Sequence, residues 1–366
     1  MTIDPSKIKR IAINTGGGDA PGLNAAIRAA TLAALRQGWE VFGIRHGYRD
    51  LVEDDPLLQL TADRVRGITH LGGTILGTAN RGNPFEYPMK SETGVQLIDI
   101  SDRVVENFHK HKLDALVCIG GDGSLRIAQR FIDKGLPIIG VPKTIDNDLG
   151  GTIITFGFDT AVSTATDAID KLHSTAESHE RVMVVEVMGR YAGWIALHSG
   201  ISGSADVILI PEIPFDIEKV CVKIREREQA GRHFAIVVCA EGAHPKGEQF
   251  RYQSPKQPGG QERLGGIAQY VADQINRHTA KETRSLVLGH LQRGGSPTTF
   301  DRLLGLRFGA AAIRCLQEGK INQMVALAPP TVKTIPISEA IKTMKTVPLD
   351  CDTMLTARSV GISFGD

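Results

Sequence analysis

Short runs of apolar residues alternate along the chain with longer stretches in which apolar positions recur at helical spacing. Runs of strand length lie at residues 10–15, 40–44, 114–120, 137–142, 181–187, 206–211, 234–242 and 284–289. Most of them are continuously apolar, which is typical of strands that are covered on both faces. Helical periodicity is clear at residues 22–38 and 166–180. This alternation predicts an α/β protein with mostly parallel sheets and helices on both faces.

The length of the chain predicts two domains, because 366 residues exceed what one hydrophobic core usually organises. We expect two doubly wound, Rossmann-like units, one before about residue 157 and one after it. In open parallel sheets ligands bind beyond the carboxyl ends of the strands, and the Gly-containing motifs of this chain follow directly after apolar runs. The polar stretch 244–266 breaks the rhythm and predicts a surface loop that leads into a helix near Ile267.

Composition narrows the possible partners. The formal net charge is +1, from 42 basic and 41 acidic residues, which gives no electrostatic reason to expect a nucleic acid or a membrane surface. No apolar run approaches the roughly 18–20 residues of a membrane span, and the first residues lack an apolar signal region. The five cysteines show no CxxC spacing and are expected to be buried, reduced thiols. We therefore expect a cytoplasmic protein.

Three turns rich in Gly or Asp follow apolar runs: NTGGGDAPG at 14–22, IGGDGS at 119–124 and PKTIDNDLGGT at 142–152. A Gly-rich corner at a helix N-terminus exposes backbone N–H groups that bind anions. Asp122 in the second corner would repel a bare phosphate unless a metal ion lies between them. The first turn matches neither the dinucleotide fingerprint nor the P-loop. The pattern predicts a site for a metal–phosphate complex.

Three carboxylates, Asp122, Asp146 and Asp148, lie at the ends of runs that we expect to be adjacent strands. Asp and Asn side chains also close turns without any further function, but turns alone explain this set poorly. Phosphoryl transfer needs a Mg²⁺ ligand, a base for the attacking hydroxyl and cations on the transferring group. The carboxylates therefore favour a phosphotransferase.

Candidate cations follow or flank the later runs; they are Arg181, Arg190, Arg284, His290 and Arg293. A lone Arg is usually a solvated surface residue, and a lone His more often has a structural role. Arginines beside Gly at strand ends, in a chain with phosphate corners, are better interpreted as oxyanion clamps. Glu241, near the end of the run at 234–242, is placed to accept hydrogen bonds from sugar hydroxyls.

Taken in order, five motifs resemble the bacterial-type 6-phosphofructokinase family from Ile11 to about Ala312; they are GGDAPGLNAAIR, GGDGS, TIDND, SHERVMVVEVMGRYAG and GHLQRGGSP. The resemblance implies Mg²⁺-dependent phosphorylation of fructose 6-phosphate at its 1-hydroxyl, giving fructose 1,6-bisphosphate in glycolysis. It also implies a homotetramer with shared active sites. The implied domains are residues 1–157 plus 292–341 for the nucleotide and 158–291 plus 342–366 for the sugar phosphate, with the active site in the cleft between them.

The resemblance also implies residue roles. Asp146 would be the base that takes the proton of the 1-hydroxyl, Asp122 would bind Mg²⁺, and Asp148 would support the metal and transition-state region. The transferring group would be stabilised by Gly18, Thr144 and Arg190. Fructose 6-phosphate would be bound by Thr144, Asp146, Asp148, Met188, Gly189, Arg190, Glu241, His290 and Arg293 of one subunit, and by Arg181 and Arg284 of a neighbour. Nucleotide contacts would come from Gly18, Arg81 (or Asn80), Gly121, Asp122, Gly123, Ser124 and Lys143, where Arg81 belongs to a loop one residue longer than the family pattern.

The family divides by phosphoryl donor, and this chain combines both patterns. Nucleotide-using members resemble GGDG with PGTIDND, and pyrophosphate-using members resemble GGDD with PKTIDND; here Gly123 matches the first group and Lys143 the second. A carboxylate at 123 would lie where the α-phosphate of a nucleotide must fit, a like-charge contact that costs several kcal/mol. Gly leaves that space open, and Lys143 excludes nothing by charge. ATP is therefore the expected donor, with ADP and pyrophosphate as alternatives.

Regulation is predicted to depart from the family. The bacterial enzymes bind a phosphorylated effector between subunits through arginines, of which Arg28 and Arg232 match. Leu32, the acidic run 53–55 and His173 stand at other expected basic positions, so the basic charge of that pocket is reduced.

Two other hypotheses fit the sequence less well. A catalytically silent nucleotide sensor would be expected to lose carboxylates or clamping arginines, and this chain keeps them. A different GGDG kinase, acting on NAD or a lipid, would have no 6-phosphate to clamp.

Overall fold

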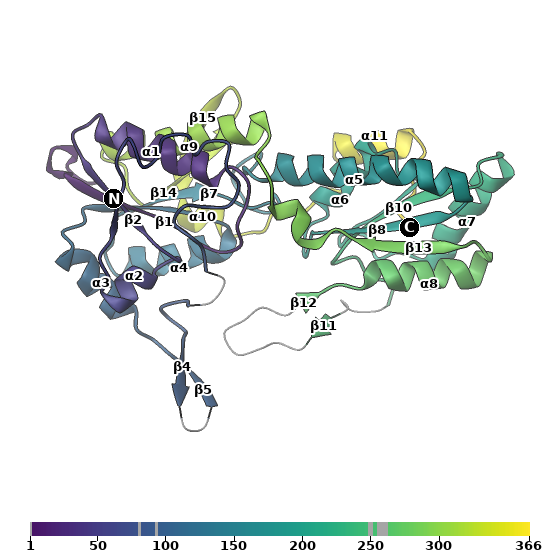
Figure 1. The fold of residues 1–366 in the computed structure, drawn as a ribbon, viewed down its shortest axis with the longest axis horizontal. Helices are drawn as coiled ribbons and strands as arrows, with labels where there is room; N and C mark the ends of the chain where they lie inside the picture. Colours follow the sequence, from purple (N-terminus) through teal and green to yellow (C-terminus); the bar gives the residue numbers. More distant parts are fainter. Residues whose placement is uncertain (1, 80–81, 92–93, 248–251, 255–262) are drawn as a thin grey trace.

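The computed structural model describes residues 2–79, 82–91, 94–247, 252–254 and 263–366. Two sheets lie side by side along the long axis of the molecule, and each carries helices on both faces (Figure 1). This is the α/β architecture that the sequence predicts, and every predicted apolar run contains a strand.

The first sheet has seven strands, and its central strands are parallel. From one edge to the other they are β15 (Thr331–Pro336), β14 (Gln323–Ala328), β7 (Ile138–Pro142), β6 (Ala115–Gly120), β1 (Arg10–Thr15), β2 (Glu40–Ile44) and β3 (Leu58–Gln59). The edge strands β15 and β3 are antiparallel to their neighbours. Strands β6 and β7 are buried along their whole length, which explains their continuous apolar sequence.

Helices cover both faces of this sheet. One face carries α1 (Leu23–Leu35) and α9 (Thr299–Gln317), and the other carries α2 (Arg49–Glu53), α3 (Ser101–Lys110), α4 (Asp122–Asp133) and α10 (Ile337–Ala340). Helices α1 and α9 approach closely because Gly309 lies between them: a Cβ there would collide with the carbonyl group of Ala26.

The second sheet has four parallel strands. In order they are β13 (Thr283–Val287), β8 (Val182–Val187), β10 (Ala235–Ala240) and β9 (Val207–Leu209). One face packs against α5 (Phe158–His179), α6 (Trp194–Ser202) and α11 (Asp352–Ser359), and the other against α7 (Ile217–Gln229) and α8 (Ile267–Thr279). A short 3₁₀ helix, η2 (Gly289–Arg293), follows β13.

The chain passes between the two sheets more than once. After β7 it forms the second sheet, and it returns with α9, β14 and β15 to the first. Its last residues then pack into the second core through Val347, Met354 and Phe364. Among the described residues, no helix has both the length and the apolar character required to span a membrane.

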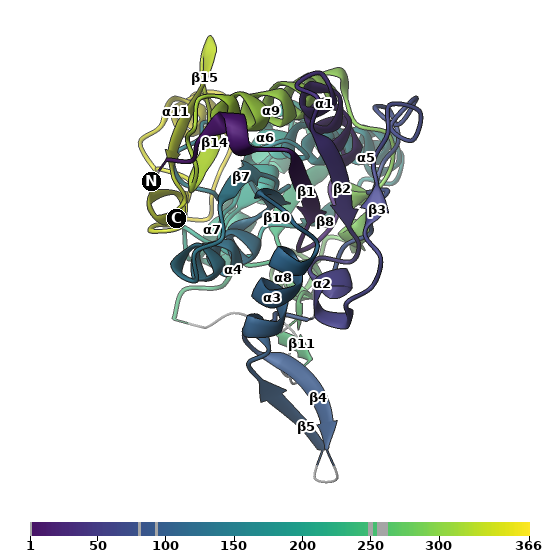
Figure 2. The same cartoon turned by 90° about the vertical axis from the view of Figure 1, so that its left-hand side faces the viewer.

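Several small elements are not predicted from the sequence. β4 (Tyr87–Ser91) and β5 (Gly94–Ile98) form a hairpin that projects from the body of the molecule (Figure 2). β11 (Tyr252–Ser254) and β12 (Arg263–Leu264) pair within the segment predicted to be a loop. The helix predicted to follow that segment is α8.

Candidate active site

The loops that follow β1, β6 and β7 in the first sheet, and β8 and β10 in the second, carry the candidate site (Figure 1). Charges from both groups of loops lie close enough to interact. Asp146, which follows β7, and Arg190, which follows β8, both act on the pKa of Glu241, which follows β10. The carboxyl ends of the two sheets therefore contribute to a single cluster of charged residues, as the sequence predicts.

The first two Gly-rich turns pack against each other beside the N-terminus of α4. Gly16 donates its N–H to the carbonyl of Ile119 at 3.0 Å, and a Cβ on Gly16 would lie 2.6 Å from Oγ of Ser124. A Cβ on Gly18 would lie 2.7 Å from Nη1 of Arg293, so the guanidinium sits directly on the first turn. The corner combines bare backbone, a helix N-terminus and a cation, which together suit an anionic ligand.

Asp122 and Gly123 are the first two residues of α4. Oδ2 of Asp122 accepts a hydrogen bond from Nε of Arg126 at 2.7 Å, and the charge of Asp122 raises the pKa of Asp148. A Cβ at Gly123 would meet no atom of the described residues within 4 Å, and φ there is not in the left-handed region. Position 123 can therefore carry a side chain without backbone strain, and that side chain would enter open space.

Lys143, at the start of the third turn, is buried against the first turn, with only 3% of its surface exposed. Its backbone N–H donates to the carbonyl of Gly120 at 2.9 Å, and its ammonium group donates to the carbonyl of Gly18. Burial, and to a smaller extent Arg293, lower the pKa of Lys143 to about 8. Lys143 therefore brings a buried donor to the glycine turn that we expect to face the phosphates.

The third turn fixes Asp146 and Asp148 on either side of Asn147. Asn147 has φ 51°, in the left-handed region that Asn tolerates better than most residues, and its Oδ1 accepts the N–H of Thr155 at 3.2 Å. The N–H of Asp146 donates to Oγ1 of Thr144 at 3.1 Å. The turn is thus closed by side-chain hydrogen bonds that leave both carboxylates available.

Both side chains are half-buried, and each has one buried carboxylate oxygen that is unsatisfied. Oδ1 of Asp146 and Oδ1 of Asp148 have no hydrogen-bond partner among the described residues. Burial first, and then the charge of Asp148, raise the pKa of Asp146 to about 6; burial also raises the pKa of Asp148, and a hydrogen bond from Thr144 opposes that shift. Buried polar atoms without partners are rare in folded proteins, so this pair is a strong indication of a ligand site.

The second sheet contributes Glu241, Arg190 and Met188. Burial raises the pKa of Glu241 to about 7, with Asp146 adding to the shift and Arg190 opposing it. The backbone N–H of Met188 donates to Oε1 of Gln292 at 3.2 Å, which ties the loop after β8 to η2. A partly buried acid between arginines and a second carboxylate suits a ligand that carries hydroxyl groups and a phosphate.

The remaining predicted site residues fall in three places. Gly121 precedes α4, and Gly189, with φ 136°, lies where a Cβ would approach the carbonyl of Ala192 to 2.8 Å. His290 is exposed on η2. Arg81 and Asn80 lie outside the described residues.

Arg181 and Arg284 are not brought to this cluster. Arg181 directly precedes β8, whereas Met188 follows that six-residue strand, so roughly 20 Å of extended chain separates them. Nε of Arg181 lies 2.8 Å from Oε2 of Glu282, and Nη2 of Arg284 lies 2.5 Å from Oε1 of the same residue. The two arginines therefore form a separate basic patch at the opposite end of the sheet.

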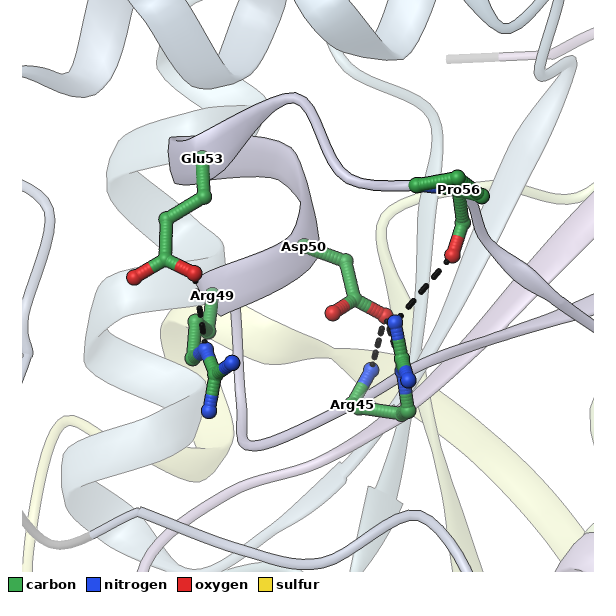
Figure 3. A network of polar contacts seen from close by, with 5 residues as sticks. All are labelled: Arg45, Arg49, Asp50, Glu53 and Pro56. Carbon is green, nitrogen blue, oxygen red and sulfur yellow. Dashed lines mark hydrogen bonds and ion pairs between the residues drawn. The ribbon is translucent and has the colours of Figure 1, made fainter.

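Side chains at positions that the resemblance links to the family's effector site make contacts within the chain. Figure 3 shows Glu53 paired with Arg49 at 2.9 Å, next to the ion pair of Asp50 and Arg45 at 3.0 Å. His173 contacts the carbonyl of Gly203 through Nε2 at 2.7 Å. The reduced effector response stays a prediction.

Sequence reasoning misses three residues that shape the site: Asn147, Gln292 and Lys345. Gln292 is fully buried and lies inside the GHLQRGGSP motif, so its place in the motif was an available signal. The same holds for Asn147, which lies between the two aspartates. Lys345 comes from the C-terminal segment, where no motif marks it.

Comparison with known proteins agrees with this arrangement. The family model described as phosphofructokinase matches residues 10–316. The ATP-dependent 6-phosphofructokinase of Chloroflexus aurantiacus is 50% identical over 361 residues, covering 99% of both chains, and ATP-dependent 6-phosphofructokinase 2 of Clostridium perfringens is 51% identical over 366 residues, covering 98% of this chain and 99% of its own. The Pichia pastoris phosphofructokinase structure matches with a TM-score of 0.79 and 32% identity, covering 93% of this chain and 36% of that one. With its phosphate corners, its paired carboxylates and these relatives, the chain belongs to the phosphofructokinase family.

Proposed function

We propose that this protein is an ATP-dependent 6-phosphofructokinase, which transfers the γ-phosphoryl group of ATP to the 1-hydroxyl of fructose 6-phosphate. The observation that carries the proposal is the pair Asp146 and Asp148, each with one buried, unsatisfied carboxylate oxygen, of which Asp146 lies within electrostatic range of Arg293. Relatives of about half identity carry this name. Formation of fructose 1,6-bisphosphate from fructose 6-phosphate and MgATP tests it directly.

The residues of the cluster divide the chemistry among them. Asp146 takes the proton of the 1-hydroxyl as the sugar oxygen attacks the γ-phosphorus, and the bond to the bridging oxygen of ADP breaks. Arg190, Thr144 and the backbone of Gly18 stabilise the charge that develops on the transferring group. Glu241 accepts hydrogen bonds from the sugar hydroxyls. Arg293 lies against Gly18 in the first glycine turn.

The donor set fits Mg²⁺ delivered with the nucleotide. Among the described residues, no group of three His, Cys, Asp or Glu side chains is arranged to hold a metal ion. Mg²⁺ in kinase sites is typically held by one or two carboxylates together with substrate phosphates, so Asp122 at the phosphate corner is sufficient. When bound, the ion neutralises charge on the phosphates of the donor.

ATP is favoured over pyrophosphate by the open space at position 123. Lys143 adds a positive charge but occupies the glycine turn rather than the space beside Gly123. ADP as donor and pyrophosphate as donor remain the alternatives.

We also propose the domain division predicted from the sequence, residues 1–157 plus 292–341 and residues 158–291 plus 342–366. The strands of the first sheet end at residue 142 and resume at residue 323, and those of the second span residues 182–287. The cytoplasmic location stays a prediction.

The reaction should depend on pH through Asp146. A base works only when it is unprotonated, and burial raises the pKa of Asp146 to about 6. We expect kcat/KM for fructose 6-phosphate to lose about tenfold per pH unit below this pKa and to level off above it. The measurement is a pH profile between pH 5 and 9 at saturating MgATP, corrected for the ionisation of the sugar phosphate. A profile that stays flat down to pH 5 would contradict this role.

A complete site needs a second copy of the chain. Arg181 and Arg284 lie far from the other sugar-phosphate ligands but close to each other, as expected if they bind the 6-phosphate in a neighbouring subunit. A homotetramer of the family type supplies such neighbours.

Complementation tests the shared site. Asp146→Ser and Arg284→Ala should each be nearly inactive alone. Co-expressed, they should recover about a quarter of wild-type activity, because half of randomly formed pairs are mixed and one site of each mixed pair has both residues intact. No recovery, with mixed assemblies verified by tag purification, would place Arg284 outside the shared site.

A further inference from the structure

Lys345, in the segment between α10 and α11, inserts its ammonium group into the third turn. Nζ donates to Oδ1 of Asn147 at 2.8 Å, to the carbonyl of Ile153 at 2.8 Å and to the carbonyl of Thr152 at 3.1 Å. These bonds use all three N–H donors of an ammonium group. The three hydrogen bonds together fix the position of the ammonium group.

The same residue also holds the turn through its backbone. The N–H of Lys345 donates to the carbonyl of Asp148 at 2.8 Å. The side chain of Asn147, which stands between Asp146 and Asp148, is fixed by Lys345 on one side and by the N–H of Thr155 on the other. The carboxylates therefore project from a turn whose centre and exit are both bonded to Lys345.

On its other side Lys345 contacts the second sheet. Its carbonyl accepts the indole N–H of Trp194 at 3.0 Å, and its ammonium lies 5.6 Å from the centre of that ring. Two residues on, the N–H of Val347 donates to Oε1 of Glu212 at 2.8 Å, and Glu212 also accepts the N–H of Gly193 at 3.0 Å. Trp194 and Gly193 lie at the start of α6, immediately after the loop that carries Arg190, and Glu212 follows β9.

Joining the third turn to the start of α6 does not by itself require a charged side chain. Burying an ammonium group costs free energy unless it is fully paired, and an apolar residue could pack across the same gap. The charge of Lys345 does act on the site, because it opposes the burial that raises the pKa of Asp148. The charge of Lys345 thus acts on Asp148, and its hydrogen bonds fix the turn that carries both carboxylates.

We propose that Lys345 is a positioning residue for the reaction, which fixes the carboxylates of Asp146 and Asp148 relative to Arg190 by bonding the third turn to the start of α6. The kinetic part of this inference rests on the proposed phosphotransferase function. The structural part does not, so the two are tested separately.

Hydrogen–deuterium exchange tests the structural part without substrates. Lys345→Met should speed amide exchange about tenfold in peptides covering residues 144–155, because Asn147, Thr152 and Ile153 lose their hydrogen bonds from the ammonium group. The control is Lys342→Met, which removes an exposed lysine of the same segment; within the described part of the chain, only its backbone forms a hydrogen bond. Equal exchange in wild type and Lys345→Met would overturn the proposal whatever the protein phosphorylates.

Steady-state kinetics test the positioning role. We expect Lys345→Met to lower kcat roughly 30–100-fold, with KM for both substrates within about threefold, because the carboxylates move while the groups that bind the phosphates remain. Asn147→Gly, which keeps the left-handed backbone, should lower kcat by a similar factor. The kcat of the double variant should be no lower than that of the less active single variant. Additive losses, or an equal rise of KM for fructose 6-phosphate, would contradict action through the turn.

Trp194→Phe is a conservative second variant, which tests the same link if Lys345→Met does not fold. It removes only the indole bond to the carbonyl of Lys345 and should lower kcat about five- to tenfold with KM unchanged. Wild-type kcat in this variant would overturn the link to α6.

Discussion

Asp146→Ser is expected to lower kcat by roughly 10²–10⁴-fold while KM for fructose 6-phosphate and ATP stays within about threefold. The variant removes the base but no group that binds phosphate. One oxygen of its carboxylate has no hydrogen-bond partner among the described residues, so its loss breaks no hydrogen bond at that atom. Steady-state kinetics with a coupled assay for fructose 1,6-bisphosphate measures the effect.

Two controls accompany this variant. Asp63→Ser removes an exposed carboxylate remote from the site and should leave kcat unchanged. Thermal unfolding at pH 8 should show Asp146→Ser to be at least as stable as wild type, because a carboxyl group whose pKa is raised in the fold destabilises it above that pKa. Near-normal turnover would remove Asp146 from the role of base.

Gly123→Asp is expected to lower kcat/KM for ATP by roughly 10²–10³-fold, since a like-charge contact of several kcal/mol would face the nucleotide phosphates. The backbone accepts the substitution, because φ at this position lies outside the left-handed region and a Cβ meets no neighbour. Kinetics with ATP varied at saturating fructose 6-phosphate measures the loss.

Gly123→Ala separates charge from volume. It adds the same Cβ without a carboxylate and should keep kcat/KM for ATP within about fivefold of wild type. An equal loss in both variants would mean that space, and not charge, decides the donor. Unchanged use of ATP by Gly123→Asp would place the nucleotide away from position 123.

The parts of the fold predicted well are those in which a run of residues carries its own signal. Buried parallel strands such as β6 and β10 are continuously apolar, and the glycines and aspartates follow them at the carboxyl ends. Strand β14 is not predicted, although its apolar sequence QMVALA was an available local signal. Edge strands such as β3, with two residues, are too short to form a pattern.

The candidate site, like the fold, has parts that a local sequence pattern predicts and parts that depend on packing between distant segments. Of the charged residues in the motifs, Asp146, Arg190 and Glu241 interact in one cluster, and the turn of Asp146 and Asp148 follows a parallel strand. Lys345 could not be identified, because its role depends on how the last segment crosses from one sheet to the other. The burial of Lys143 against the first turn likewise follows from packing between two loops rather than from either sequence.

The most direct test of the proposed activity is turnover of fructose 6-phosphate by the purified protein with Mg²⁺ and, in separate assays, ATP, ADP or pyrophosphate. We predict fructose 1,6-bisphosphate with ATP, at a kcat/KM at least about a hundredfold above that with pyrophosphate, given the open space at Gly123. Turnover with pyrophosphate alone would show that Lys143 decides the donor and that the space at position 123 does not.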